Sequence, residues 1–261
     1  MTTKDGAPRR EVPDYERGLA PPQPARTYRC RRTPRRLAID GDLTKPEWAT
    51  APWTDLFVDI EGDLRPAPRF ATRAKLLWDD ERLYVGAELE EPDLWATLTE
   101  RDSVIFHDND FEVFLDPSCE GRGYYELEIN ALGTVWDLVL REPYRAGGQA
   151  DSVWRIEGLE TAVRLDGTLT DPSDRDRGWT VEIAMPFAAF DVHAEMRGER
   201  PRAPRPGERW GLDFSRVQWD LEVEDGRYRK IEGRKEHNWV WSPMGLIDMH
   251  LPLRWGSLVF E

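Results

Sequence analysis

Long apolar runs are missing from this 261-residue sequence. No segment approaches the roughly 20 consecutive apolar residues that a membrane-spanning helix needs, so we expect no membrane partner. The first ten residues are polar and lack the apolar stretch of about 7–15 residues that marks a secretory signal. As written, the chain is therefore expected to be cytoplasmic.

Cysteine is scarce too, and basic residues are outnumbered by acidic ones. Two cysteines, Cys30 and Cys119, are too few for a disulfide scaffold or a zinc site, and whether they pair stays open. Lys and Arg number 36 against 50 Asp and Glu, which gives a net charge of −14. Nucleic acid would need a cationic face, so we expect no nucleic-acid partner. Neutral ligands such as sugars remain compatible with this charge.

Tryptophan, in contrast, is abundant, with twelve in the chain. Its large, rigid and amphipathic ring suits both a protein core and a binding platform. We expect most of the twelve in the core and three or four at a ligand site.

The chain divides into two parts by composition. Residues 1–36 are rich in proline and charge without an apolar period, and predict a flexible or surface-draped leader. Residues 37–261 predict one domain, because short β-rich runs alternate there with Gly, Pro, Asp and Asn. The pattern favours an all-β fold, an antiparallel β-sandwich of jelly-roll or immunoglobulin-like two-sheet architecture, with long loops and one or two short helices.

Individual strands can be placed from the alternation. A hairpin is expected from residues 74–78 and 83–89, joined by a polar four-residue loop. A short helix is expected after Pro186, at residues 187–190. Further strands are expected at residues 111–116, 124–130, 134–140, 161–166, 179–184, 210–219, 228–231 and 257–260.

Alternation also places polar side chains on one face of two of these strands. Glu112 points away from the core-facing Phe111 and Val113, and Glu128 and Asn130 share the polar face of the next strand. Neighbouring strands would then present three polar groups on one concave face. The alternative is that they are ordinary solvent-facing strand residues.

A second candidate lies in the turn-rich segment 235–256, which holds Asn238, Trp239, Trp241 and Trp255. A sugar ring stacks on an exposed aromatic ring while carboxylates and amides bind its hydroxyls, so these residues are consistent with a sugar site. The alternative is that the rings plug the ends of the sandwich.

Five motifs in order resemble those of carbohydrate-binding module family 9: residues 39–48 (IDGDLTKPEW), 77–85 (LWDDERLYV), 108–117 (DNDFEVFLDP), 124–130 (YYELEIN) and 178–186 (GWTVEIAMP). With the closing residues 255–260 (WGSLVF), they cover nearly everything after residue 36. The resemblance implies a β-sandwich related to the DOMON superfamily. It also implies non-catalytic binding of gluco- or xylo-type sugars in the service of carbohydrate catabolism.

The resemblance further implies a set of site residues. Glu112 and Asn130 fall on the family's Glu and Asn ligands. The family's Arg falls near Glu128, and its first clamping tryptophan near Phe106, both departures. The second clamping tryptophan falls near the loop that holds Trp239 and Trp241.

Other polar residues have two interpretations each. Arg216 would supply the missing guanidinium or form a structural ion pair, and His250 would bind a hydroxyl or cap a turn. Family members tend to bind structural calcium, and Asp108, Asn109 and Asp110 crowd oxygen donors together as a hard cation requires. No other cofactor is expected.

Two alternative functions have other sequence requirements. A glycoside hydrolase, or a hydrolase-associated subunit acting on O-glycosyl bonds, would need two carboxylates at a defined separation, and no pair stands out among the acidic residues. A DOMON-type haem domain needs Met and His on opposite sides of the haem. Met244, Met249 and His250 lie too close together in sequence for that.

Overall fold

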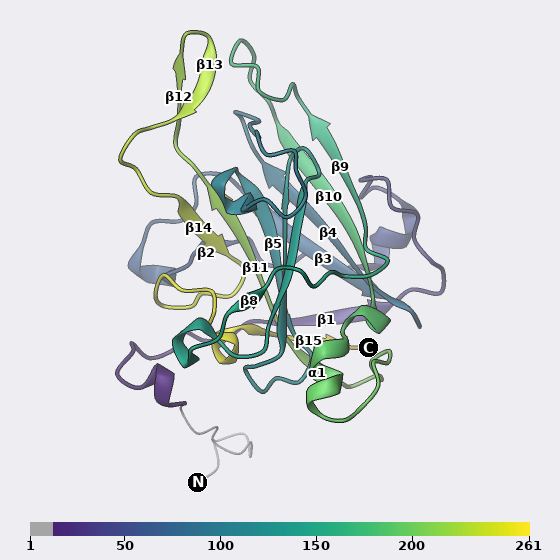
Figure 1. The fold of residues 1–261 in the computed structure, drawn as a ribbon. Helices are drawn as coiled ribbons and strands as arrows, with labels where there is room; N and C mark the ends of the chain where they lie inside the picture. Colours follow the sequence, from purple (N-terminus) through teal and green to yellow (C-terminus); the bar gives the residue numbers. More distant parts are fainter. Residues whose placement is uncertain (1–12) are drawn as a thin grey trace.

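The computed structural model describes residues 13–261 and shows a mostly β chain curled into a two-layer sandwich, as predicted (Figure 1). The strands are β1 Thr27–Arg32, β2 Val58–Asp59, β3 Thr72–Trp78, β4 Arg82–Glu90, β5 Asp110–Asp116, β6 Tyr124–Asn130, β7 Val135–Leu140, β8 Ala150–Asp151, β9 Glu160–Asp166, β10 Gly178–Pro186, β11 Arg209–Gln218, β12 Leu221–Glu224, β13 Arg227–Lys230, β14 His237–Val240 and β15 Gly256–Phe260. The α-helix is α1 Asp191–Met196, and 3-10 helices span Asp14–Glu16, Pro46–Thr50, Gly62–Leu64, Ile105–His107, Tyr144–Ala146, Phe187–Ala189 and Pro252–Arg254.

The two layers are continuous through one strand. The first sheet runs β8-β7-β6-β5-β11-β15, with β14 and β2 extending from β11, and the second runs β3-β4-β10-β9. Strand β1 joins them because Thr27 to Cys30 pair with β15 while Arg31 and Arg32 pair with β3. Both pairings of β1 are parallel, whereas the other pairs are antiparallel. A strand that passes from one sheet to the other makes a corner of this kind.

The core between the layers follows the period-2 alternation of the strands. Phe111, Val113 and Leu115 of β5 pack there with Val181 and Ile183 of β10. The opposite faces of β5 and β6 therefore point outward.

One part of that outer face is covered by other segments of the chain. Phe114 and Tyr124 pack under Met249 and Trp255 from the C-terminal region, and Tyr15 packs against the same cluster. The apolar residues of the outer face are therefore the ones that other segments cover. The polar end of β5, β6 and β7 is the part of the outer face that stays uncovered.

The predicted strands and the 74–89 hairpin all occur, with boundaries shifted by one or two residues. The boundary at residue 37 was wrong, because β1 lies at residues 27–32 and joins the two sheets. The part of the predicted leader at residues 13–26 does run over the surface, where Glu16 forms a buried ion pair with Arg254 (2.9 Å). Residues 1–12 lie outside the described part of the chain. Among the described residues, no helix has the length and hydropathy to cross a membrane.

Candidate functional site

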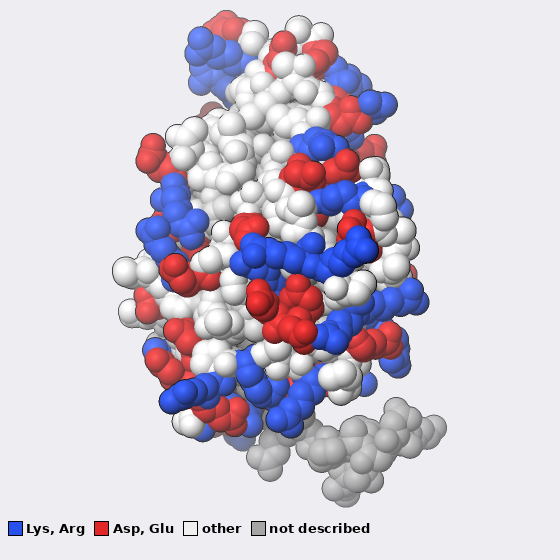
Figure 2. Space-filling model, turned by 90° about the vertical axis from the view of Figure 1, so that its right-hand side faces the viewer, with Lys and Arg blue, Asp and Glu red and all other residues white. Residues whose placement is uncertain are grey.

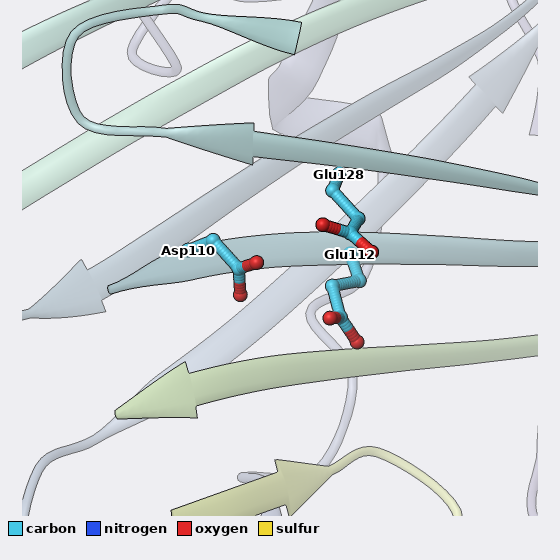
Figure 3. A group of neighbouring side chains, drawn as sticks. All are labelled: Asp110, Glu112 and Glu128. Carbon is cyan, nitrogen blue, oxygen red and sulfur yellow. The ribbon is translucent and has the colours of Figure 1, made fainter. Parts of the chain in front are cut away.

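Carboxylates gather on the uncovered polar end of the first sheet. Glu112 on β5 stands directly opposite Glu128 on β6, so the two side chains share the outer face as predicted. One carboxylate oxygen from each of Asp110, Glu112 and Glu128 lies within 4.8 Å of the others (Figure 3). Glu126 lies next along the same face of β6. We call Asp110, Glu112, Glu126 and Glu128 the acidic face.

The side chains of the acidic face are largely buried. Glu112 and Glu126 are each 5% exposed and Glu128 is 2% exposed. Burial raises the pKa of Glu112 to about 7. The nearby Ser215 hydroxyl acts in the opposite direction, because it favours the charged form of Glu112. Burial, together with the neighbouring negative charges, also raises the pKa of Asp110, Glu126 and Glu128 well above the ordinary range. The acidic face is thus a cluster of four buried carboxyl groups whose ionisation is opposed by burial and by one another.

Aromatic rings border the acidic face. Trp136 on β7 stands directly opposite Glu128, and its half-buried ring lies 6.5 Å from the ring of Phe106. The backbone N–H of Phe106 donates to Glu128 Oε2 (2.9 Å), and its carbonyl accepts from Trp219 Nε1 (2.9 Å). Tyr144 is 44% exposed and its ring packs edge-on against His250 (4.5 Å), and its pKa is raised to about 12 by partial burial and by the charges of Glu126 and Glu128.

One polar atom among these rings has no internal partner. Trp136 Nε1 is buried and forms no hydrogen bond with the described residues. Buried indole N–H groups normally find an acceptor, and leaving one unpaired costs roughly 1–3 kcal/mol. The site therefore offers one free donor beside a row of carboxylate acceptors.

Asn130 lies on the same face, but its side chain is fully used. Its amide nitrogen donates to Leu98 O (2.9 Å) and Asp108 Oδ2 (2.9 Å), and its oxygen accepts from the N–H groups of Leu132 and Thr134 (3.0 Å each). Asn130 thus shapes the β6–β7 turn and has no capacity left for a ligand.

The predicted calcium triad is not brought together. Asp108 accepts from Thr97 and from the N–H of Leu98, and Asn109 Oδ1 accepts from the N–H of Trp219 (2.8 Å). Of the three residues, Asp110 turns toward Glu112 and Glu128 instead. Asp108 and Asn109 precede β5, and their side-chain oxygens are taken by donors from neighbouring segments, whereas Asp110 is the first residue of the strand.

Arg216 points away from the acidic face, into the interior of the sandwich. It is 0% exposed and pairs with Glu91 Oε2 (2.7 Å), while Thr72 and Gln218 accept its other N–H groups. Since Ser215 faces Glu112, alternation sends Arg216 to the other side of β11. Of the two interpretations of Arg216, the structure therefore supports the internal ion pair.

Trp239 and Trp241 are also internal, so the expectation that they are exposed was wrong. They are 3% and 2% exposed and belong to the core between the sheets. The Trp239 ring packs edge-on against Phe70 (6.1 Å) and lies under the Arg216 guanidinium (5.2 Å). The segment that was expected to be a loop contains β14, whose alternation sends these rings inward.

Asn238 and His250 remain near the surface. Asn238 pairs with Val217 on the outer side of β11 and borders a hollow of about 370 Å³, lined also by His237, Arg69 and Ile247. His250 Nδ1 bonds the Tyr124 hydroxyl (3.1 Å), and its backbone N–H donates to Asp248 (2.9 Å), which is the turn role. Burial lowers the pKa of His250 to about 4, so the ring is neutral at pH 7.

A groove of about 940 Å³ lies over the outer face of the second sheet. Figure 2 shows acidic and basic side chains intermingled on the side of the molecule where β9 and β10 lie. Arg73 pairs with Glu88 (2.8 Å), Arg164 with Asp42 (3.1 Å), and the Trp53 ring is covered by Lys75 (4.2 Å). Because these groups already satisfy one another, the acidic face is the better candidate.

A comparison with protein families matches residues 39–242 to the carbohydrate family 9 binding domain-like family. The chain belongs to this family. A comparison with curated proteins finds none that matches.

The motif at residues 39–48 now has a structural explanation in the family 9-like domain. Glu182 of the 178–186 motif accepts from the N–H groups of Asp40 (2.9 Å) and Gly41 (3.1 Å) and from Trp48 Nε1 (2.7 Å).

Solved structures share the fold of this family 9-like domain. A Bacteroides uniformis ATCC 8492 protein for which carbohydrate binding is suggested is 17% identical, with a TM-score of 0.65 over 90% of this chain and 99% of that one. A family 9 module from Caldicellulosiruptor kristjanssonii with cellotriose is 16% identical, with a TM-score of 0.54 over 90% and 94%. The same organism's module with glucose is 17% identical, with a TM-score of 0.53 over 89% and 95%.

Three residues of the candidate site were missed from the sequence: Trp136, Ser215 and Tyr144. Trp136 lies in a correctly predicted strand. The short turn at residues 130–134 fixes the pairing of that strand with the preceding one, so counting back from the turn would have placed Trp136 opposite Glu128. Ser215 also lies in a predicted strand, but its pairing with Glu112 comes from a partner about one hundred residues away. Tyr144 lies in a loop, for which alternation gives no direction.

Proposed function

We propose that this family 9-like domain binds carbohydrate, without catalysis, on the acidic face between Phe106, Trp136 and Tyr144. The observation that carries the proposal is the unpaired indole N–H of Trp136 beside Glu112 and Glu128. A sugar hydroxyl both donates and accepts, so it matches a free donor next to free acceptors. The C–H face of a pyranose would lie on the rings of Phe106 and Trp136.

The ligand class follows from the same groups and from the family. The solved family 9 modules were obtained with cellotriose and glucose, which supports gluco-type sugars, with xylo-type sugars of the same equatorial hydroxyl pattern as the second class. A shallow site for one or two rings should bind with micromolar to millimolar dissociation constants, roughly −8 to −4 kcal/mol. Such a protein would serve carbohydrate catabolism by holding a sugar rather than by cleaving it.

Trp136→Ala is expected to weaken the binding of cellobiose by about tenfold or more, because both the ring contact and the indole donor are lost. Trp136→Phe keeps a ring and removes the donor, so it should fall between Ala and the native protein. Isothermal titration of the three proteins measures this. Trp53→Ala, on the outer face of the second sheet, is the matched control and should bind as the native protein does. Equal affinity for Trp136→Ala and native protein, or a loss in Trp53→Ala instead, contradicts the proposal.

A further inference from the structure

The acidic face holds oxygen donors and no nitrogen or sulfur ligand. One oxygen each from Asp110, Glu112 and Glu128 lies within 4.8 Å of the others. Calcium binds oxygen ligands at 2.3–2.6 Å, so oxygens on opposite sides of the ion lie about 4.6–5.2 Å apart. Carboxylates at this spacing suit a hard divalent cation.

Two oxygens lack hydrogen-bond partners here, one on Asp110 within the cluster and one on Ser215 beside it. Asp110 is 0% exposed, and while its Oδ1 accepts from the N–H of Val217 (3.0 Å), its Oδ2 has no hydrogen-bond partner. Ser215, also 0% exposed, stands directly opposite Glu112, and its hydroxyl has no hydrogen-bond partner among the described residues. Buried polar atoms are normally satisfied, so two unpaired oxygens at one place point to a ligand site.

The described part of the chain supplies no countercharge for the carboxylates of the acidic face when they ionise. Among residues 13–261, no Lys or Arg forms an ion pair with Asp110, Glu112, Glu126 or Glu128. His250 Nε2 is 4.0 Å from Glu126, but it is neutral at pH 7 because burial lowers its pKa to about 4. Several buried carboxylates without a countercharge are costly, and a bound cation removes that cost.

We propose that a calcium ion binds between Asp110, Glu112 and Glu128, with the Ser215 hydroxyl nearby, and that it holds the sugar through two adjacent hydroxyls. The sugar-binding part of this inference rests on the function proposed above. Calcium takes 6–8 oxygen ligands, more than these side chains offer, so positions remain for hydroxyls. The ion would also keep the carboxylates charged at pH 7.

Terbium is a luminescent substitute for calcium, and Trp136 stands opposite Glu128, where its excitation can pass to the ion. On excitation of tryptophan, the native protein should give saturable terbium emission that calcium displaces. Glu112→Gln and Ser215→Ala should weaken this binding, the first by about tenfold or more because a charged ligand is lost. Glu88→Gln, a carboxylate on the opposite sheet, should leave it unchanged. Folding of each variant is checked by its thermal transition. Absence of saturable emission in native protein, or the same affinity in folded Glu112→Gln, overturns the cation site.

Titration with cellobiose in calcium and in EDTA separates this inference from the proposed function. Binding that needs calcium supports both. Equal binding in calcium and EDTA, without terbium emission, supports the sugar site and overturns the cation. Terbium emission without sugar binding in either buffer supports the cation site and overturns the role of the ion in holding sugar.

Discussion

Arg216→Ala is expected to lower the free energy of unfolding by about 3–5 kcal/mol, because it leaves Glu91 buried without its partner. Burial raises the pKa of Glu91 and the Arg216 charge opposes that rise, so the carboxylate depends on the guanidinium to stay ionised. The substitution also removes the cation over the Trp239 ring (5.2 Å). Urea denaturation followed by tryptophan fluorescence measures the change.

The matched control is Arg29→Ala, which breaks the exposed pair between Arg29 and Glu261 (2.9 Å). Exposed pairs of this kind contribute about 0–1 kcal/mol. A loss below 1 kcal/mol in Arg216→Ala, accompanied by a loss of sugar binding, would show that Arg216 is a ligand residue and that its internal role is wrong.

Glu112→Gln is expected to raise the free energy of unfolding at pH 8 in EDTA by up to about 3 kcal/mol. This magnitude follows from the rise in the Glu112 pKa from 4.5 to about 7 on folding. Below pH 4.5 both the folded and the unfolded states of native protein carry the proton, so this group costs nothing. Between pH 4.5 and 7 the unfolded state ionises first, and native stability falls as pH rises. Above pH 7 the full cost is present.

Denaturation of native protein and Glu112→Gln at pH 4, 6 and 8 in EDTA measures this difference. The gap should be small at pH 4 and largest at pH 8, and calcium should close it by stabilising native protein alone. Glu88→Gln controls for the loss of a surface charge and should show no such trend. If the difference in the free energy of unfolding between the two proteins is constant with pH, burial does not raise the pKa of Glu112 and this account is wrong.

Much of the fold was predictable because strand alternation is a local property. The strands with clear apolar alternation, such as β5 and β6, were placed to within one or two residues. Strand β1 was missed because half of its sequence, TYRCRR, is arginine, and only Tyr28 and Cys30 are buried. Its place in the sandwich comes from parallel pairing with β15 more than two hundred residues away, which no local pattern reveals.

The candidate site was predictable in part for the same reason. Alternation put Glu112 and Glu128 on one face, and the structure agrees. It could not say that Trp239 and Trp241 point inward, because the sequence around them is rich in turn residues and hides strand β14. Nor could it show that the Asn130 amide is fully hydrogen-bonded, since its nitrogen donates to Leu98 and Asp108 in a separate segment.

The most direct test of the sugar site is to follow the tryptophan indole N–H signals by NMR while cellobiose is added, with calcium present. Substitution of Trp136 and Trp53 assigns their two signals. A saturable shift of the Trp136 signal with the Trp53 signal unmoved is the predicted result, because a sugar hydroxyl would take up the unpaired indole donor. A saturable shift at Trp53 alone would place the sugar on the second sheet, and no shift at either, at millimolar sugar, would contradict carbohydrate binding at the acidic face.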